Sequence, residues 1–214
     1  MAMWSECLDN QSTVRSPLPA ADVQQKVGSI SLSSTDMESL SGEGELVVDS
    51  VVDAYLTIVQ SKHPESFYFS LPFFQLLYTS RGYDFENVGA LFSDVDIFSK
   101  QFVYFPIIFG AHYFLVVADM ENKAIRAYDS MGTDRSFFMR IILTYLCDEF
   151  DHRSQLAPIT RAHGLPPPIF SPSDWTFDNV FTPNTRIQHN GTDCGVYLMK
   201  FVELLPTGME TYSH

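Results

Sequence analysis

The feature of the sequence that most constrains the fold is the stretch HYFLVVADMENKAIRAYDSM, which covers residues 112–131. An apolar run at residues 112–118 is followed by the polar segment DMENK and by a second apolar run at residues 124–128. This order is typical of a β-hairpin. Because the strands of a hairpin run antiparallel, the start of the first strand lies beside the end of the second. The sequence therefore predicts that His112 and Asp129 are neighbours.

Helical patterns lie on both sides of this hairpin. Apolar residues recur along one broad helical face in residues 45–60, and residues 134–153 have helical length and period. The run CGVYLMKFVELL predicts a third helix that begins at Cys194 and is ended by Pro206 or Gly208. The apolar run FVYFPIIF adds a strand before the hairpin. Strands in the middle of the chain with helices before and after them predict an α+β fold.

The chain divides into two regions by composition. Residues 1–44 are rich in Ser, Gly and acidic residues, and their apolar residues follow no period. We predict that this region is a disordered tail. Residues 45–214 are long enough to bury a sizeable core and are predicted to form one domain. Within that domain residues 152–186, which contain three consecutive prolines, are predicted to be a loop.

Composition also excludes several classes of protein. The chain carries 13 Lys and Arg residues against 26 Asp and Glu residues, a formal net charge of −13. This charge argues against a nucleic-acid partner and favours partners with basic surfaces. No apolar run has the length of a membrane span, and the N-terminus carries no secretory signal pattern. We therefore expect a protein that works without nucleic acid or membrane. We also expect it to be a monomer.

The three cysteines follow no disulfide pattern, which indicates a reducing compartment. We accordingly expect an intracellular protein of the nucleus, the cytoplasm or both. The Cys and His positions lack the spacing of zinc ligands, so we expect no metal and no other cofactor. Cys7 and Cys147 are interpreted as structural or incidental, because the first lies in the tail and the second in a predicted helix.

Cys194 is presented differently, in the segment QHNGTDCGVY between a turn and a predicted helix. A thiol is a useful nucleophile only as a thiolate, and it needs a base, a group that orients the base and an oxyanion donor. The start of a helix favours the thiolate. His112 can act as the base, Asp129 can orient the imidazole, and the amide of Gln188 can donate to the oxyanion. Each residue alone is more often structural, and the combination is what indicates a cysteine hydrolase.

These motifs resemble a known family. HYFLVVADMENKAIRAYDS followed by QHNGTDCGVYLMKF is similar to the ubiquitin-like-modifier cysteine proteases, which comprise the SUMO (sentrin) proteases and their deneddylase relatives. The resemblance covers residues 46–205. It implies a papain-like cysteine protease fold, in which helices flank a central mixed or antiparallel sheet and the nucleophile starts a helix. Residues 45–214 would be the catalytic domain, and we expect it to be a C-terminally truncated or divergent member.

The resemblance also implies a mechanism. Cys194 would attack the carbonyl, His112 would act as base and then as acid, Asp129 would orient the imidazole, and Gln188 would stabilise the oxyanion. The substrate would be the C-terminal Gly-Gly tail of a SUMO-like modifier. The enzyme would cleave this tail from a target lysine or from the end of a modifier precursor.

Four residues are predicted to bind this substrate. In relatives one Trp follows the catalytic His and another stands at the head of the first helix, whereas this chain has Tyr113 and Leu46 at these positions. A smaller wall at position 46 should hold the Gly-Gly tail less tightly. Asp49 and Asp53 share a helix face and either contact arginines of the modifier or form an ordinary solvated surface.

Two alternatives stay open at this point. The altered aromatic positions favour a weak or inactive binder of ubiquitin-like proteins, although the intact set of Cys, His, Asp and Gln argues against it. A cysteine protease of another specificity, such as a deneddylase, is the second alternative. The modifier-binding face would distinguish the two specificities.

Overall fold

The computed structural model describes residues 25–41, 44–89, 91, 94–156, 170–180 and 188–207. Its centre is a five-stranded sheet in the order β3-β6-β7-β8-β9. The three central strands pair antiparallel, and the two edge strands pair parallel with their neighbours. The sheet is therefore mixed, as predicted. Its strands are β3 (Ser66–Tyr68), β6 (Phe102–Phe109), β7 (His112–Asp119), β8 (Ala124–Tyr128) and β9 (Thr176–Asn179).

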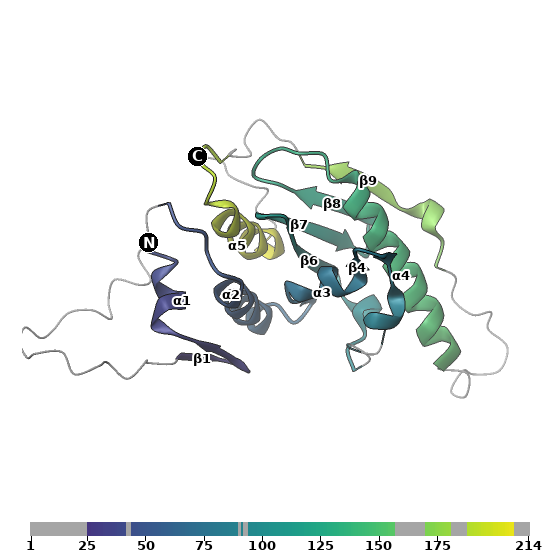
Figure 1. The fold of residues 1–214 in the computed structure, drawn as a ribbon. Helices are drawn as coiled ribbons and strands as arrows, with labels where there is room; N and C mark the ends of the chain where they lie inside the picture. The colour runs from purple at the N-terminus through teal and green to yellow at the C-terminus, as the bar shows by residue number, and fades with distance from the viewer. Residues whose placement is uncertain are drawn as a thin grey trace, which may run out of the picture.

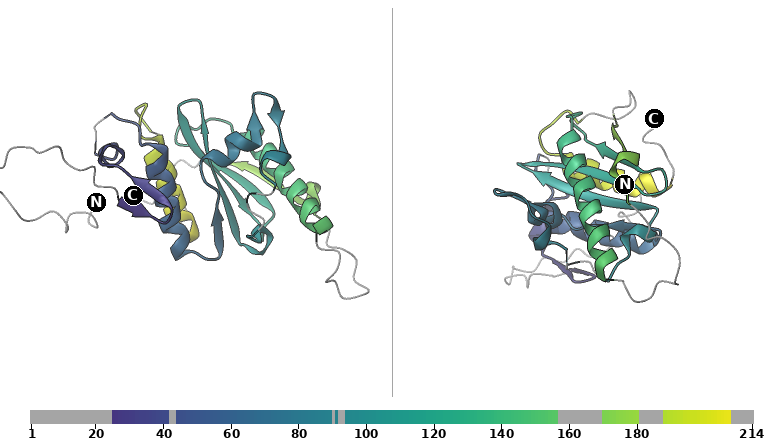
Figure 2. Two further views of the ribbon diagram at one scale, coloured as in Figure 1. Left: turned by 60° about the horizontal axis from the view of Figure 1, so that its bottom comes forward. Right: turned by 90° about the vertical axis from the view of Figure 1, so that its right-hand side faces the viewer.

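Helices cover both faces of the sheet, which confirms the α+β class (Figure 1). One face carries α2 (Asp49–Lys62) and α5 (Cys194–Leu204). The other carries α3 (Pro72–Leu77) and α4 (Ser136–Leu156). The views in Figure 2 show the same layers from two other sides.

The apolar core is split in two by the sheet because successive side chains of a strand point to opposite faces. Along β7, Phe114 and Val116 belong to the cluster that includes α3 and α4. Tyr113 and Leu115 belong to the cluster that includes α2 and α5. Because of this alternation, neighbouring residues at the start of β7 pack on opposite faces of the sheet.

The predicted hairpin is confirmed as β7 and β8, with Leu115 opposite Tyr128 and Asp119 opposite Ala124. The predicted helices correspond to α2, α4 and α5, although their ends differ by a few residues. α5 ends before a 3₁₀ turn at Leu205–Thr207 that contains Pro206, in agreement with the predicted stop. None of the described helices is long and apolar enough to cross a membrane.

The prediction of a disordered tail up to residue 44 is wrong for residues 25–41. They form β1 (Gln25–Val27), β2 (Ile30–Leu32) and α1 (Ser34–Glu38). Leu32 is buried in the same cluster as α2, and Ser33 caps α1 through a capping box. Elements this short show no readable period, so their order comes from packing on α2. Residues 1–24 and 42–43 of the predicted tail, with Cys7, lie outside the described residues.

The loop predicted for residues 152–186 is also partly wrong. α4 continues to Leu156, a 3₁₀ turn covers Pro172–Asp174, and β9 pairs with β8. β9 is largely exposed, so its sequence lacks the apolar alternation of a half-buried strand. Residues 157–169 and 181–187 of that segment lie outside the described residues. The remaining short elements are β4 (Tyr78–Thr79), β5 (Gly82–Tyr83) and the 3₁₀ turns Phe85–Asn87 and Ile97–Ser99.

Candidate active site

The hairpin brings His112 and Asp129 together, as predicted. Nε2 of His112 lies 2.7 Å from Oδ1 of Asp129, and the Asp129 side chain is almost fully buried. His112 stands at the start of β7 because a two-residue turn at Gly110 and Ala111 joins it to β6, where Phe109 is its partner. Gly110 has φ +65°, a left-handed conformation that glycine adopts without strain.

Asp129 accepts three further hydrogen bonds, two of them from the backbone. Met131 N donates to Oδ1 at 2.9 Å, and Thr133 N donates to Oδ2 at 3.2 Å. Arg135 Nε donates to Oδ2 at 2.8 Å. Arg135 was not predicted from the sequence, because its position in the first turn of a predicted helix gave no sign that its side chain turns back to the hairpin.

Cys194 is the first residue of α5 and is 1% exposed. Its close packing depends on Gly195, where an added Cβ would lie 3.2 Å from Cβ of Val47 and 3.7 Å from the ring of Tyr113. A larger residue at 195 would press on Val47, so the start of α5 or the segment before α2 would have to shift. In the described part of the chain, no three His, Cys, Asp or Glu side chains are grouped so that they could hold a metal ion.

The electrostatics of the site favour a charged Cys–His pair. Burial opposes ionisation of Cys194, but its hydrogen bond with His112 and the N–H groups of Tyr113 and Gly195 lower the pKa of the thiol below its usual value. Burial likewise opposes the charge on His112, but hydrogen bonds with Asp129 and Cys194 raise its pKa to about 9. The arrangement can therefore hold a thiolate beside an imidazolium near neutral pH.

Asp129 stays ionised in this site. Burial raises the pKa of its carboxyl group, but the hydrogen bonds from His112 and Met131 and the charge of Arg135 outweigh burial and lower it. Since Nε2 of His112 is bound to Asp129, the other ring nitrogen, Nδ1, is left for Cys194. By contrast, Cys147 on α4 is half-buried, and burial raises the pKa of its thiol. Cys147 therefore lacks the features of a nucleophile.

Gln188 is connected to the same site through Ser130. The hydroxyl of Ser130 donates to Oε1 of Gln188 at 2.6 Å, and Gln188 N donates to the carbonyl oxygen of Ser130 at 2.9 Å. Nε2 of Gln188 donates to the carbonyl oxygen of Asn190 at 2.8 Å, and among the described residues its second N–H is left available. Ser130 therefore fixes which way the amide of Gln188 faces.

The predicted substrate-binding residues have different surroundings. Leu46 is 41% exposed, but Tyr113 is only 5% exposed and packs in the core beside α5. Its hydroxyl donates a hydrogen bond to the carboxylate of Asp49 and also lies 3.1 Å from the carbonyl oxygen of Val47. Tyr113 thus ties the start of β7 to the start of α2.

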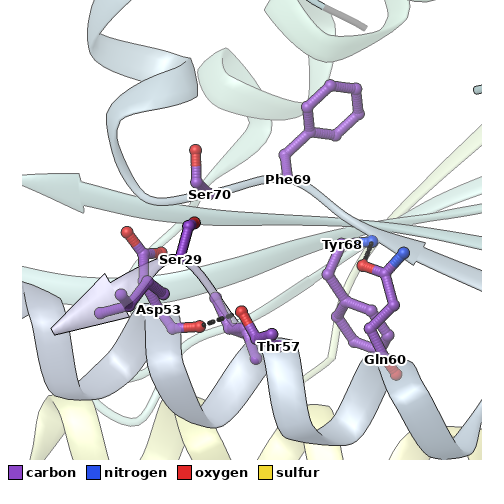
Figure 3. Close-up of a pocket in the computed structure, with 9 residues that line it drawn as sticks. Ser29, Asp53, Thr57, Gln60, Tyr68, Phe69 and Ser70 are labelled. Atoms are coloured by element: carbon purple, nitrogen blue, oxygen red, sulfur yellow. Dashed lines mark hydrogen bonds between the residues drawn. The ribbon is translucent and has the colours of Figure 1, made fainter. Parts of the chain in front are cut away.

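Asp53 lies away from the four predicted catalytic residues. Its Oδ1 accepts a hydrogen bond from Leu71 N at 2.9 Å, and its carboxylate lines a polar pocket of about 260 Å³ with Thr57, Gln60 and Ser70 (Figure 3). Burial in this pocket raises the pKa of Asp53. None of the predicted catalytic residues lines the pocket.

Comparisons with known proteins support the resemblance seen in the sequence. The chain is 26% identical over 170 residues to human sentrin-specific protease 5, an alignment that covers 79% of this chain and 20% of that protein. It is 30% identical over 181 residues to a sentrin-specific protease of Caenorhabditis elegans, which covers 82% of this chain and 23% of that protein. The chain thus spans between a fifth and a quarter of the length of these relatives.

Solved structures and a family profile complete the comparison. The C-terminal Ulp1 protease domain in complex with Smt3, the yeast ortholog of SUMO, gives a TM-score of 0.68 at 18% identity and covers 89% of this chain and 80% of that one. The Ulp1-like SUMO protease catalytic domain of Chaetomium thermophilum gives a TM-score of 0.68 at 19% identity, with 92% and 77% covered. The profile of the Ulp1 protease family, C-terminal catalytic domain, matches residues 47–213. The chain therefore belongs to the Ulp1 protease family.

Proposed function

We propose that this chain is a cysteine protease that cleaves after the C-terminal Gly-Gly of a SUMO-like modifier, either from a conjugated lysine or from the modifier precursor. The observation that carries the proposal is the position of His112. One nitrogen of its imidazole is held by Asp129, and the ring acts on the thiol of Cys194 at the start of α5.

In the first half of the reaction, the Cys194 thiolate attacks the carbonyl carbon of the last glycine. The negative charge that develops on the carbonyl oxygen is stabilised by the free N–H of Gln188 and by the backbone N–H of Cys194. When the tetrahedral intermediate collapses, the C–N bond breaks and His112 gives its proton to the leaving amine. The modifier remains attached to Cys194 as a thioester.

In the second half, His112 is neutral and accepts a proton from a water molecule, whose oxygen attacks the thioester carbonyl. The C–S bond breaks, and the thiolate and the imidazolium are restored. The modifier leaves with a free C-terminal carboxyl group, which loses the second proton of the water to the solvent. Asp129 keeps the imidazole in one tautomer throughout and stabilises its charged form.

The enclosure of the nucleophile supports a tail of small residues. Cys194 is 1% exposed, and Val47, Tyr113 and Gly195 crowd the start of its helix. A substrate with little side-chain volume beside the scissile bond fits such a site best, and Gly-Gly has the least. The net charge of −13 supports a modifier with a basic surface.

The test is reaction of the purified chain with modifier tails that end in a Gly-Gly electrophile, taken from SUMO, from ubiquitin and from the deneddylase substrate. We expect covalent capture by the SUMO probe, loss of capture in Cys194→Ser, and full capture in the matched control Cys147→Ser. Preferential capture by another probe would reassign the modifier. Binding of SUMO without capture by any probe would instead indicate an inactive binder.

We also propose that the chain works inside the cell, in the nucleus or the cytoplasm, as a monomer that needs neither nucleic acid nor a membrane. The three cysteines follow no disulfide pattern, which supports a reducing compartment. Fractionation of cells that express the tagged protein, together with light scattering of the purified chain, tests both points. A secreted pool or a stable dimer would contradict them.

A further inference from the structure

Arg135 is a largely buried arginine next to the site that the mechanism above does not use. Its side chain is 11% exposed, and its Nε lies 2.8 Å from Oδ2 of Asp129. We propose that Arg135 is a positioning residue, which fixes the Asp129 carboxylate so that the imidazole of His112 is held where it keeps Cys194 ionised. This inference rests on the proposed function, because it assigns Arg135 a part in the same reaction.

The bonds to Asp129 show how the positioning works. Oδ1 accepts from His112 and from the N–H of Met131, whereas Oδ2 accepts from Arg135 and from the N–H of Thr133. The two oxygens therefore have separate sets of donors. Rotation of the carboxylate would break both sets at once. Without Arg135, Oδ2 keeps only the longer bond from Thr133, and the carboxylate is freer to turn away from His112.

Arg135 is itself held in place from several directions. Its guanidinium carbon lies 4.1 Å from the centroid of the Phe114 ring, a cation–π contact. The ring of Phe114 also stacks on that of His112, with centroids 6.2 Å apart. The backbone N of Arg135 donates to Oδ1 of Asn179 at 2.8 Å. The guanidinium of Arg135 is therefore held by β7, and its backbone is held by β9.

The charges around Asp129 support the same role. Among the described residues, His112 from β7 and Arg135 from the start of α4 are the ionisable groups that bond Asp129. Asp129 and Cys194, from α5, are those that act on His112. The charge of Arg135 contributes to the lowered pKa of Asp129. The carboxylate consequently stays ionised and stays paired with the imidazolium on which the Cys194 thiolate depends.

The experiment compares Arg135→Gln with Arg135→Lys and with the matched control Arg126→Gln. Arg126 makes an equivalent pair with Asp119, at 2.8 Å, at the opposite end of the hairpin. The first readout is the rate of Cys194 alkylation by iodoacetamide as a function of pH, corrected with the same variants carrying Cys194→Ser. The second is kcat and KM on a Gly-Gly substrate. Circular dichroism reports whether each variant is folded.

We expect Arg135→Gln to move the midpoint of alkylation to higher pH by about one unit and to lower kcat about 10–100-fold, with KM changed less than about threefold. Arg135→Lys keeps the charge but not the planar guanidinium, so its shift should be smaller and in the same direction. Arg126→Gln should leave the midpoint unchanged.

A folded Arg135→Gln with the midpoint of the parent protein would overturn the proposal, as would equal shifts in Arg135→Gln and Arg126→Gln. If Arg135→Gln does not fold, an unshifted midpoint in Arg135→Lys would overturn it. The alkylation readout needs no modifier. If the parent protein cleaves no tail at all, the proposed function fails while the midpoint still decides the role of Arg135.

Discussion

The two ends of the β7–β8 hairpin use nearly the same chemistry for different purposes. At one end Asp119 is 3% exposed and pairs with Arg126 at 2.8 Å. At the other end Asp129 is 4% exposed and pairs with Arg135 at 2.8 Å. Asp119 also accepts two hydrogen bonds from Asn122 and so closes the turn of the hairpin. Asp129 instead accepts from His112.

The comparison shows that a buried Asp–Arg pair does not by itself mark a functional site. Arg126 belongs to β8, so the pair at the turn is local to the hairpin. Arg135 comes from beyond the hairpin, and its place depends on β9 through Asn179. The end that faces Cys194 is thus assembled from distant segments, whereas the turn end is complete within a few residues. Each of the following predictions contrasts the two ends.

The largest expected difference is in catalysis. Asp129→Asn should lower kcat/KM about 10³-fold or more, because the amide can donate to Nε2 and favour the wrong tautomer of His112. Asp119→Asn should leave kcat/KM within about twofold, because its partners do not touch the Cys–His pair. Steady-state kinetics on one Gly-Gly substrate measures both. A similar loss in both variants would remove the functional distinction between the ends.

The second difference is in pH dependence. The Cys194 thiolate needs a protonated His112, whose pKa is raised to about 9, so kcat/KM should be retained through neutral pH and should fall about tenfold per unit above that value. Asp119 has a lowered pKa and Arg126 a raised one, so the turn pair keeps its charges across this range. A profile from about pH 5 to about pH 10 tests this. An alkaline limb near the ordinary His value would contradict the expected pair.

The third prediction concerns stability, for which the turn end with Asp119 is expected to matter although it does not matter for catalysis. Asp119→Asn should lower the free energy of unfolding by about 1–3 kcal/mol, because Arg126 loses its charged acceptor and Asn122 loses the anion that closes the turn. Urea unfolding followed by circular dichroism gives this value. The exposed pair of Lys123 and Asp174 offers a control, since Asp174→Asn should cost less than about 1 kcal/mol. Equal losses of unfolding free energy in Asp119→Asn and Asp174→Asn would show that burial of the turn pair contributes little to stability.

The smallest effect is expected from a larger aromatic side chain at positions 46 and 177. Leu46 is 41% exposed near the start of α2, and Phe177 is 38% exposed on β9 opposite Ile125. Leu46→Trp should lower KM for a Gly-Gly substrate about threefold, because a larger wall covers more of the tail. Phe177→Trp should leave KM unchanged. An unchanged KM in Leu46→Trp would argue against contact between position 46 and the tail.

Local and distant contacts also explain which parts of the fold and of the site could be predicted from the sequence. The hairpin, α2, α4 and α5 are long enough for apolar periodicity to identify them, and the proximity of His112 and Asp129 follows from strand pairing alone. The motif around Cys194 indicates a nucleophile at a helix start. The elements β1, β2, α1, β3 and β9 are too short or too exposed for a period to appear, and they form because of the surfaces on which they pack.

The sequence by itself thus determined the α+β class and the family, and it predicted the four catalytic residues His112, Asp129, Gln188 and Cys194. Only the tertiary structure decided how they are oriented. Ser130 turns the amide of Gln188, and Arg135 holds the second oxygen of Asp129. Tyr113 is buried against α5 with its hydroxyl on Asp49. The physical reason is that a motif fixes which residues lie near one another along the chain, whereas hydrogen-bond direction and burial depend on side chains that arrive from separate strands and helices.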